Sequence, residues 1–260
     1  MNDLVLTQHA GPVAILTLNR PARHNSLVPE FLAAIEAALT AVSAAPTARA
    51  LLLQANGRSF STGGDALGFV EHAADIEAYS LDVVGRLNRV ILALLDLPVP
   101  VVTAVHGIVT GGALGFVLAS DIVLLAAEAS FTPFYSVVGP SPDGGWATLL
   151  PLLIGPRRAA EVLYLNQTIA AETAVAWGLA NRVVPAAELR ETARDVAQQI
   201  AAKQPGSIRR TRRLLHVGRA DIAARLEAER QEFVAEMTTG AGLAGFETFL
   251  ADLRARKQPA

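Results

Sequence analysis

The sequence predicts an α/β fold with mostly parallel, buried strands, followed by a helical C-terminal part. Three observations predict it. Short apolar runs recur along the first half of the chain, and most are followed by a loop and then by a helical pattern. From Pro156 onward, Ala, Arg, Glu and Leu dominate and strand signals become rare. A repeat of strand, loop and helix is typical of a sheet whose strands are covered on both faces.

The individual elements follow from length and periodicity. Apolar runs of strand length predict strands over 13–18, 50–55, 101–105 and 122–126. Apolar residues at helical spacing predict helices over 26–43, about 80–95 and 113–120, and a loop is expected over 106–112. The C-terminal part is expected to form helices at about 157–165, 171–178, 186–203, 205–216, 218–237 and 241–255, and no further strand.

Composition excludes several classes of protein. The chain has 260 residues and no cysteine, so it forms no disulfide and has no thiolate zinc site or cysteine nucleophile. A net charge of −2 provides no general attraction to nucleic acid or to an anionic membrane. Hydrophobic residues make up 52% and charged residues 18%, which predicts a large core. The low charged share also suggests that another subunit covers some apolar surface.

Targeting and membrane signals are absent from the sequence as given. The first residues, Met1 to Leu4, show neither the basic nor the apolar region of a signal peptide. The stretch Leu97–Ser120 has no formally charged residue, but two prolines and several glycines interrupt it. A buried strand, a loop and a buried helix explain it better than a bilayer helix does. We expect a soluble, cytoplasmic protein.

Two glycine loops share one setting. Residues 63–65 (Gly-Gly-Asp) and 110–113 (Thr-Gly-Gly-Ala) each follow an expected strand and precede a helical segment. Small residues there can expose backbone N–H groups, and two such groups from separate loops could form an oxyanion hole. The alternative is that these glycines only end strands and permit close packing. Sequence alone does not show that the two loops meet.

Five motifs give the chain a family resemblance, and they occur in the family's order and spacing. They are residues 19–27 (NRPARHNSL), 60–65 (FSTGGD), 104–121 (from AVHG to ASD), 176–184 (AWGLANRVV) and 245–250 (GFETFL). Together they extend over nearly the whole chain. The sequence resembles the crotonase, or enoyl-CoA hydratase/isomerase, superfamily.

The resemblance implies a spiral of repeated ββα units in residues 1–200, which carries the acyl-CoA site, and a helical region over 201–260 for trimerisation and CoA contact. It implies an acyl-CoA thioester substrate whose carbonyl oxygen accepts the N–H groups of Gly64 and Gly112. It implies no cofactor beyond the CoA of the substrate, and a homotrimer or a homohexamer. Nucleic acid and membrane are not expected partners. The substrate-binding residues that it implies are Arg23, His24, Asp65, Ala66, Leu67, Phe246, Phe249 and Lys257, although the spacing to Lys257 departs from the usual one.

The acid–base residues depart from the hydratase pattern. Hydratases of this family use two glutamates to add water across a double bond. By position, the first glutamate falls at Gly115 and the second at Tyr135, so both carboxylates are missing. Tyr135 is instead expected to line the acyl pocket or to donate a hydrogen bond there, or to be a partly buried aromatic residue.

Asp143, in Ser-Pro-Asp-Gly-Gly-Trp, is the remaining candidate. It resembles the Pro-Asp element of family members that isomerise unsaturated or ring-opened acyl-CoAs, including 2-(1,2-epoxy-1,2-dihydrophenyl)acetyl-CoA isomerases. The same position carries the nucleophile of the haloaryl-CoA dehalogenases, but that branch also needs a histidine and a tryptophan at positions that are not filled here. Pro-Asp-Gly-Gly is also good turn chemistry, and an aspartate before a helix is a good N-cap. Because no carboxylate stands at the two usual positions, we interpret Asp143 as the proton-transferring residue, with a pKa raised by an apolar pocket.

The leading hypothesis is therefore an acyl-CoA double-bond isomerase with Asp143, Gly64 and Gly112 as its catalytic groups. The alternatives are a hydratase with atypical acid–base groups and a catalytically silent acyl-CoA-binding homologue. A dinucleotide-binding dehydrogenase is disfavoured because residues 111–115 lack the G-x-G-x-x-G spacing. The sequence does not indicate the acyl chain or ring that is preferred.

Overall fold

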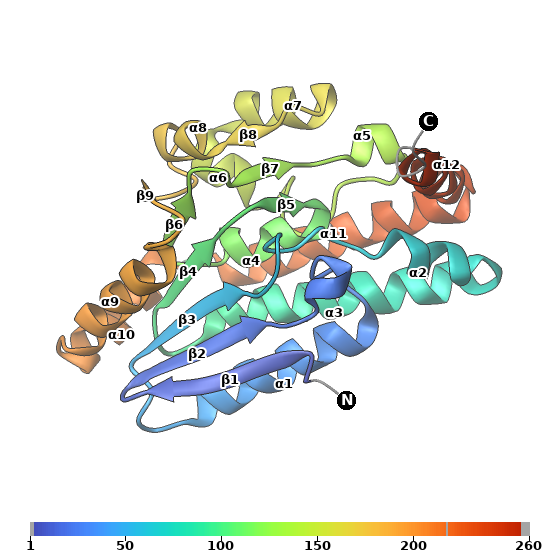
Figure 1. The fold of residues 1–260 in the computed structure, drawn as a ribbon. Helices are drawn as coiled ribbons and strands as arrows, with labels where there is room; N and C mark the ends of the chain where they lie inside the picture. Colours follow the sequence, from blue (N-terminus) through green and yellow to red (C-terminus); the bar gives the residue numbers. More distant parts are fainter. Residues whose placement is uncertain (1–2, 217, 256–260) are drawn as a thin grey trace.

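A six-stranded sheet forms the centre of the molecule in the computed structural model, which describes residues 3–216 and 218–255 (Figure 1). Its strand order is β1-β2-β3-β4-β6-β9. The strands are β1 (Val5–Ala10), β2 (Val13–Leu18), β3 (Ala50–Ala55), β4 (Val101–Val105), β6 (Ile122–Ala126) and β9 (Arg182–Val184). The four strands predicted from apolar runs are confirmed with the same bounds.

The sheet is parallel apart from its first strand. β1 pairs with β2 antiparallel, whereas β2, β3, β4, β6 and β9 are joined by parallel pairing. In a parallel sheet the carboxyl ends of the strands meet at one edge, and ligands bind there in many α/β proteins. Because β3 and β4 are neighbours, the loops that follow them leave the sheet side by side. The two glycine loops belong to these connections.

Both faces of the sheet are covered. On β3, Leu51 and Leu53 point into the larger core cluster, which also contains residues of helices α1 (Pro29–Ala44) and α3 (Ile76–Asp96). Ala50 and Leu52 point to the opposite face and pack with residues of helix α9 (Leu189–Ala201). This alternation explains why each central strand is apolar throughout: both faces of the strand are buried.

The helices lie between and after the strands of the main sheet. They are α1 (Pro29–Ala44), α2 (Ala66–Glu71), α3 (Ile76–Asp96), α4 (Leu114–Leu118), α5 (Tyr135–Val138), α6 (Leu150–Ile154), α7 (Pro156–Leu165), α8 (Ala171–Ala176), α9 (Leu189–Ala201), α10 (Pro205–Leu215), α11 (Arg219–Thr238) and α12 (Ala241–Ala255), with 3-10 turns η1 (Pro21–Arg23), η2 (Ala73–Asp75) and η3 (Gly111–Ala113). The predicted helix over 26–43 begins only at Pro29, since proline is well suited to the first turn and Ser26 bonds to Asp65 instead.

Short strands are where the sequence-based expectation was wrong. The loop expected over 106–112 contains β5 (Ile108–Thr110), which forms a second sheet with β7 (Ser130–Thr132) and β8 (Ile169–Ala170). The part beyond Pro156 is not purely helical, because β9 adds a strand to the main sheet. Strands of two or three residues are too short for an alternating or continuous apolar pattern, so tertiary pairing alone defines them.

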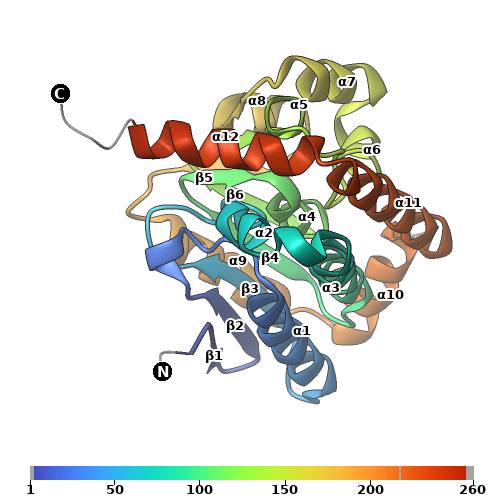
Figure 2. The ribbon, with the colours of Figure 1, turned by 90° about the vertical axis from the view of Figure 1, so that its right-hand side faces the viewer.

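The last helices pack on the core of the same chain. α11 lies along α3, and α12 contacts α2 and α5 (Figure 2). α10 is fixed by the buried Arg212, which donates to Asp121 and to the carbonyls of Leu94, Leu95 and Leu97. The C-terminal helices therefore reach the region where the glycine loops lie.

The uncharged stretch Leu97–Ser120 forms β4, β5 and α4. Among the helices of the described residues, none combines the length and the apolar character that crossing a bilayer requires.

Candidate active site

The two glycine loops lie directly against each other. Ser61 and Val109 form a parallel bridge, and the N–H of Thr110 donates to the carbonyl of Ser61 at 3.1 Å. The Thr110 hydroxyl donates to the carbonyl of Thr62 at 2.8 Å. These bonds align the Gly63–Gly64 segment with the Gly111–Gly112 segment, and they provide the meeting of loops that sequence alone does not show.

Glycine is required at this contact. Gly63 has a φ of +71°, and a Cβ at that position would lie 2.5 Å from the carbonyl oxygen of Thr110. A side chain there would force the loops apart. Within the described residues, no hydrogen bond uses the backbone N–H of Gly64 or of Gly112. Both N–H groups are therefore without a hydrogen-bond partner in that part of the chain, as the oxyanion-hole prediction requires.

Asp143 lies beside the second glycine loop. The residue is 6% exposed. A Cβ built on Gly112 would lie 3.1 and 3.2 Å from its two carboxylate oxygens, so the carboxyl group faces the Gly112 backbone. Gly144, with a φ of +64°, packs so closely on Gly112 that no side chain fits between them. The turn that carries Asp143 is thus docked on the loop that carries the proposed oxyanion donor.

Tyr135 is the hydrogen-bonding partner of Asp143. Its hydroxyl donates to Oδ1 of Asp143 at 2.5 Å and also lies 3.1 Å from the Asp143 carbonyl oxygen. Burial, the largest influence, raises the pKa of Asp143 to about 7; the Tyr135 bond lowers it and the charge of Glu229 raises it. Burial and the adjacent Asp143 raise the pKa of Tyr135, so this hydroxyl stays protonated and remains a donor.

Glu229 on α11 supports the same turn from behind. Its carboxylate accepts the backbone N–H groups of Gly145 at 2.8 Å and Ala147 at 3.0 Å. The residue is 6% exposed, and burial raises the pKa of its carboxyl group against these hydrogen bonds. Within the described residues, no Lys, Arg or His forms an ion pair with Glu229 or Asp143.

At the first of the two positions where a hydratase carries glutamates, a carboxylate side chain has no room. A Cβ on Gly115 would lie 2.7 Å from the carbonyl oxygen of Gly144 and would also meet the Ile91 side chain. A longer side chain at position 115 has no room unless the Asp143 turn moves. The second position holds Tyr135, whose hydroxyl is bonded to Asp143.

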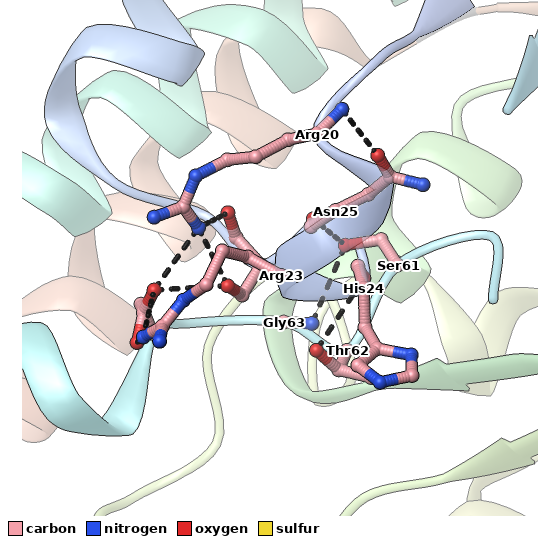
Figure 3. A network of polar contacts seen from close by, with 9 residues as sticks. Arg20, Arg23, His24, Asn25, Ser61, Thr62 and Gly63 are labelled. Atoms are coloured by element: carbon pink, nitrogen blue, oxygen red, sulfur yellow. Dashed lines mark hydrogen bonds and ion pairs between the residues drawn. The ribbon is translucent and has the colours of Figure 1, made fainter. Parts of the chain in front are cut away.

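Asp65 is engaged in a separate network, which Figure 3 shows from close by. Its carboxylate accepts Arg20 at 3.0 Å, Arg23 at 2.9 Å and the Ser26 hydroxyl at 3.0 Å. Although burial raises it, the hydrogen bonds from the two guanidinium groups bring the pKa of Asp65 below its ordinary value. The Asp65 backbone is occupied as well, since its N–H donates to the Leu27 carbonyl at 3.0 Å and its carbonyl accepts the N–H of Phe69 at 3.2 Å. Asp65 therefore holds this region together through both its side chain and its backbone.

The side chains predicted to meet the CoA part are spread over two regions. Arg23 and His24 belong to η1 and its C-cap, but they point to different sides of the loop (Figure 3). His24 bonds through Nδ1 to the Ser59 hydroxyl at 3.1 Å. Ala66 and Leu67 begin α2 directly after Asp65.

A cleft of about 610 Å³ opens next to the Asp65 network. Arg20, Arg23, Leu67 and Tyr79 are among the residues that line it, while Asp143, Gly64 and Gly112 are not. This cleft therefore lies beside the proposed reacting groups and not over them.

The aromatic residues of α12 pack within the chain. Phe246 stacks on Phe69 with ring centroids 5.1 Å apart, and Phe249 lies 6.1 Å from Phe134. These contacts place α12 beside α2 and α5. The predicted contact from Lys257 lies outside the described residues.

Sequence reasoning missed the surroundings of Asp143. Tyr135 was identified by its position, but its bond to Asp143 was not predicted, and neither Glu229 nor Trp146 was a candidate. Glu229 is surrounded in sequence by charged residues of an exposed-looking helix, so no local signal distinguishes it. Among the described residues, no group of three His, Asp or Glu side chains is arranged to hold a metal ion.

Comparison with known proteins agrees with this architecture. A family model described as Enoyl-CoA hydratase/isomerase matches residues 8–252. A "Probable enoyl-CoA hydratase" of Mycobacterium bovis is 34% identical over 267 aligned residues, which cover 99% of this chain and 92% of that protein. A 1,2-epoxyphenylacetyl-CoA isomerase of Escherichia coli is 34% identical over 204 residues, 78% of each chain. The crystal structure of an enoyl-CoA hydratase/isomerase from Mycobacterium paratuberculosis has a TM-score of 0.88 at 26% identity, covering 95% of this chain and 99% of that one.

The sheet, the adjoining glycine loops and the C-terminal helices define the class as an α/β protein of the crotonase fold. Within that class, the chain belongs to the enoyl-CoA hydratase/isomerase family.

Proposed function

We propose that this enzyme is an acyl-CoA double-bond isomerase in which Asp143 carries the proton. The observation that supports it best is the setting of Asp143: a buried carboxyl group beside Gly112, with a pKa of about 7 and no cationic partner in the described residues. A general base is most effective when its pKa lies near the working pH. Near neutral pH, Asp143 is divided between the form that accepts a proton and the form that returns it.

The proposed reaction needs one carboxylate and two backbone donors. Asp143 removes a proton from C2 of a 3-enoyl-CoA; the electrons of that C–H bond form a C1–C2 double bond, and the carbonyl π electrons move onto the thioester oxygen. The resulting dienolate keeps the C3–C4 double bond, and its oxygen accepts the N–H groups of Gly64 and Gly112. Asp143 returns the proton to C4: the C3–C4 π electrons form the new C–H bond, the C1–C2 π electrons become the C2–C3 double bond, and the thioester carbonyl re-forms. Each donor of this kind is worth about 2.7–4 kcal/mol of transition-state stabilisation.

Hydration is the second candidate, and the relatives keep it open because the Mycobacterium bovis protein is named a probable enoyl-CoA hydratase. Water addition by two glutamates does not fit this site, since the Gly144 carbonyl and Ile91 fill the space at position 115. A hydratase built on this chain would have to use Asp143 with water alone. The third candidate is a homologue that binds acyl-CoA without turnover.

Incubation with two substrates separates these candidates. The enzyme is mixed with 3-hexenoyl-CoA or 2-hexenoyl-CoA, and the products are followed by liquid chromatography with mass detection. Isomerisation leaves the mass unchanged, whereas hydration adds the mass of one water. We expect the 3-enoyl thioester to give the 2-enoyl thioester, and an epoxyphenylacetyl-type CoA then tests for ring substrates.

Two results would contradict the proposal. Conversion of 2-hexenoyl-CoA to a hydroxyacyl-CoA as the faster reaction would make the enzyme a hydratase. Binding of all three thioesters without turnover would identify the silent homologue.

The proposal extends to the CoA part and to assembly. Arg23, His24, Ala66, Leu67 and α12 are proposed to meet CoA as in the family. Large apolar side chains exposed on α6 and α7, Leu152, Tyr164 and Leu165 at 63%, 79% and 70%, suit burial in a homotrimer or homohexamer. Size-exclusion chromatography with light scattering measures the mass of the assembly directly. A monomer at micromolar concentration would contradict the proposed trimer or hexamer.

A further inference from the structure

Trp146 is buried next to the proposed oxyanion donor. The residue has no exposed surface, and its indole Nε1–H donates to the carbonyl oxygen of Gly111 at 2.7 Å. Its ring lies edge-on to Tyr135, with centroids 6.3 Å apart and an interplanar angle of 80°. Trp146 therefore touches both the loop of Gly112 and the partner of Asp143.

The acceptor of this bond belongs to a critical peptide unit. The carbonyl of Gly111 and the N–H of Gly112 form one planar, trans peptide group, so they point in opposite directions. Fixing the carbonyl fixes the direction of the N–H. Both residues of this peptide are glycines, which restrain the peptide plane less than other residues do. The Gly111 carbonyl also accepts the N–H of Leu114 in η3, and the Trp146 bond adds a second restraint from a distant turn. A hydrogen bond to the carbonyl also polarises the peptide and strengthens its N–H as a donor.

The turn that carries Trp146 is itself held in place. Its two neighbours, Gly145 and Ala147, donate their N–H groups to Glu229. Three residues earlier in the same turn, Asp143 faces the Gly112 backbone. One turn thus connects the proposed base to the peptide that carries the proposed oxyanion donor.

We propose that Trp146 is a positioning residue that aims and polarises the Gly112 N–H through its bond to the Gly111 carbonyl. The inference rests on the proposed function, because it concerns the oxygen of an acyl-CoA thioester bound at Gly64 and Gly112. Trp146 does not touch the substrate oxygen. Trp146 acts on the strength and direction of one hydrogen-bond donor, the Gly112 N–H.

The sharpest test removes the indole N–H without changing the shape of the side chain. Trp146→3-benzothienylalanine replaces the N–H by sulfur. The probe is butyryl-CoA labelled with ¹³C at the thioester carbonyl; it is saturated, so it has no double bond to move. Isotope-edited infrared difference spectra give the carbonyl stretch of the bound thioester, and calorimetry gives its Kd.

In the native enzyme, we expect binding to lower the carbonyl frequency, because two N–H donors polarise the bond. In the Trp146→3-benzothienylalanine enzyme, we expect a clearly smaller lowering with a Kd within about threefold of the native value, since an aimed donor acts most on developing charge. The same replacement at Trp177, which packs against Arg158, is the matched control and should leave the frequency unchanged.

A second variant at position 146 keeps the inference testable if the first variant does not fold. Trp146→Phe also lacks the N–H donor. With 3-hexenoyl-CoA as substrate, its kcat should be about 10- to 100-fold lower than that of the native enzyme, with little change in KM. This decrease is smaller than the one expected when a complete oxyanion donor is removed. Thermal unfolding identifies which variants are folded. A rise in KM with unchanged kcat would show a merely structural role and would overturn the inference.

The outcomes distinguish the two proposals. An unchanged frequency in the position-146 variant, with a lowered frequency in the native enzyme, overturns the role of Trp146 and leaves the oxyanion hole standing. No lowering in the native enzyme overturns the thioester site itself, and the role of Trp146 falls with it.

Discussion

Asp65 and Asp143 are two aspartates of nearly equal burial, 5% and 6% exposed, in opposite electrostatic settings. Asp65 directly follows Gly64 and is held by two guanidinium groups and a hydroxyl. Asp143 faces the Gly112 backbone, and among residues 3–216 and 218–255 its one side-chain partner is a tyrosine hydroxyl. The pKa of Asp65 lies below its ordinary value, whereas that of Asp143 is raised to about 7.

The difference shows what makes a buried carboxyl group able to transfer protons. Burial pushes the pKa of both groups upward. Hydrogen bonds from two arginines and a serine bring the pKa of Asp65 down, whereas the charge of Glu229 raises the pKa of Asp143 further, against the Tyr135 bond. Asp65 remains ionised and joins η1 to the start of α2. Asp143 has no such counter-charge in the part of the chain that the structure describes, and with a pKa of about 7 both of its protonation states are accessible near neutral pH. The lack of a cationic partner among the described residues therefore supports the proposed role of Asp143 as much as the carboxyl group itself does.

Asp143→Asn should have the largest effect on the reaction. The amide keeps the shape of the side chain but cannot accept the C2 proton, so kcat should fall about 10²–10⁴-fold for isomerisation of 3-hexenoyl-CoA. Initial rates by chromatography measure it, and circular dichroism checks the fold. Native turnover in the folded variant would remove Asp143 from the mechanism.

The same variant should change how stability depends on pH. Because the native state keeps the Asp143 proton up to about pH 7 and the unfolded chain releases it near 3.8, native stability falls between these values. Asp143→Asn should abolish that decline and stabilise the protein at pH 8 by up to about 4 kcal/mol. Urea unfolding at pH 5 and pH 8 measures the difference.

Asp65→Asn should mainly reduce stability. It leaves two guanidinium groups without their counter-charge, and breaking a buried pair costs about 3–5 kcal/mol; the loss here should be nearer the lower end since Arg23 is 45% exposed. The lowered pKa of Asp65 gives the opposite sign to Asp143: its stabilisation is present above the ordinary pKa and is lost as the pH falls through the lowered value. Urea unfolding at pH 7 and pH 3 tests it.

If Asp65→Asn left the free energy of unfolding unchanged at pH 7, the contrast between a structural and a proton-transferring aspartate would fail. Asp82→Asn, which removes an exposed partner of Arg86, is the control and should cost less than about 1 kcal/mol.

Tyr135→Phe should move the pH profile without abolishing the reaction. The Tyr135 hydroxyl lowers the pKa of Asp143 by bonding to it, so its removal should raise that pKa and shift the acid limb of kcat/KM to higher pH. The rate profile from pH 5 to pH 9 measures it. Tyr79→Phe, which removes a hydroxyl near Asp65, should leave the limb in place, and a shift to lower pH in Tyr135→Phe would contradict the assignment.

Glu229→Gln should give the smallest shift, in the opposite direction. The charge of Glu229 raises the pKa of Asp143, so a neutral glutamine should lower it and move the acid limb to lower pH. The N–H groups of Gly145 and Ala147 donate to different oxygens of Glu229, and glutamine keeps an acceptor for only one of them, so circular dichroism must show that the variant is folded. If the limb stayed where it is, Glu229 would act on the turn only as a hydrogen-bond acceptor.

Sequence alone predicted the parts of the molecule that depend on local pattern. β2, β3, β4 and β6 were placed with the right bounds because burial on both faces produces a continuous apolar run. β9 has three residues and no pattern of its own, so only its pairing with β6 reveals it.

The candidate site likewise has one part that local sequence predicts and one part that only the folded structure shows. The glycine loops and Asp143 carry motifs that sequence reasoning can recognise. The properties of Asp143 depend on contacts between distant segments: Tyr135 from the start of α5, and Glu229 from α11. The two arginine partners of Asp65 lie 45 and 42 residues away in sequence. The two aspartates can be identified from the sequence, but which of them has a pKa near neutral pH depends on the contacts that form when the chain folds.

The most direct measurement is a ¹³C NMR titration of the aspartate carboxyl carbons in the folded enzyme, with Asp143→Asn and Asp65→Asn to assign the two signals. We predict that the Asp143 signal titrates near pH 7 and that the Asp65 signal stays ionised to below the ordinary aspartate pKa. An Asp143 signal that titrates near 4, as an exposed aspartate does, would contradict the account.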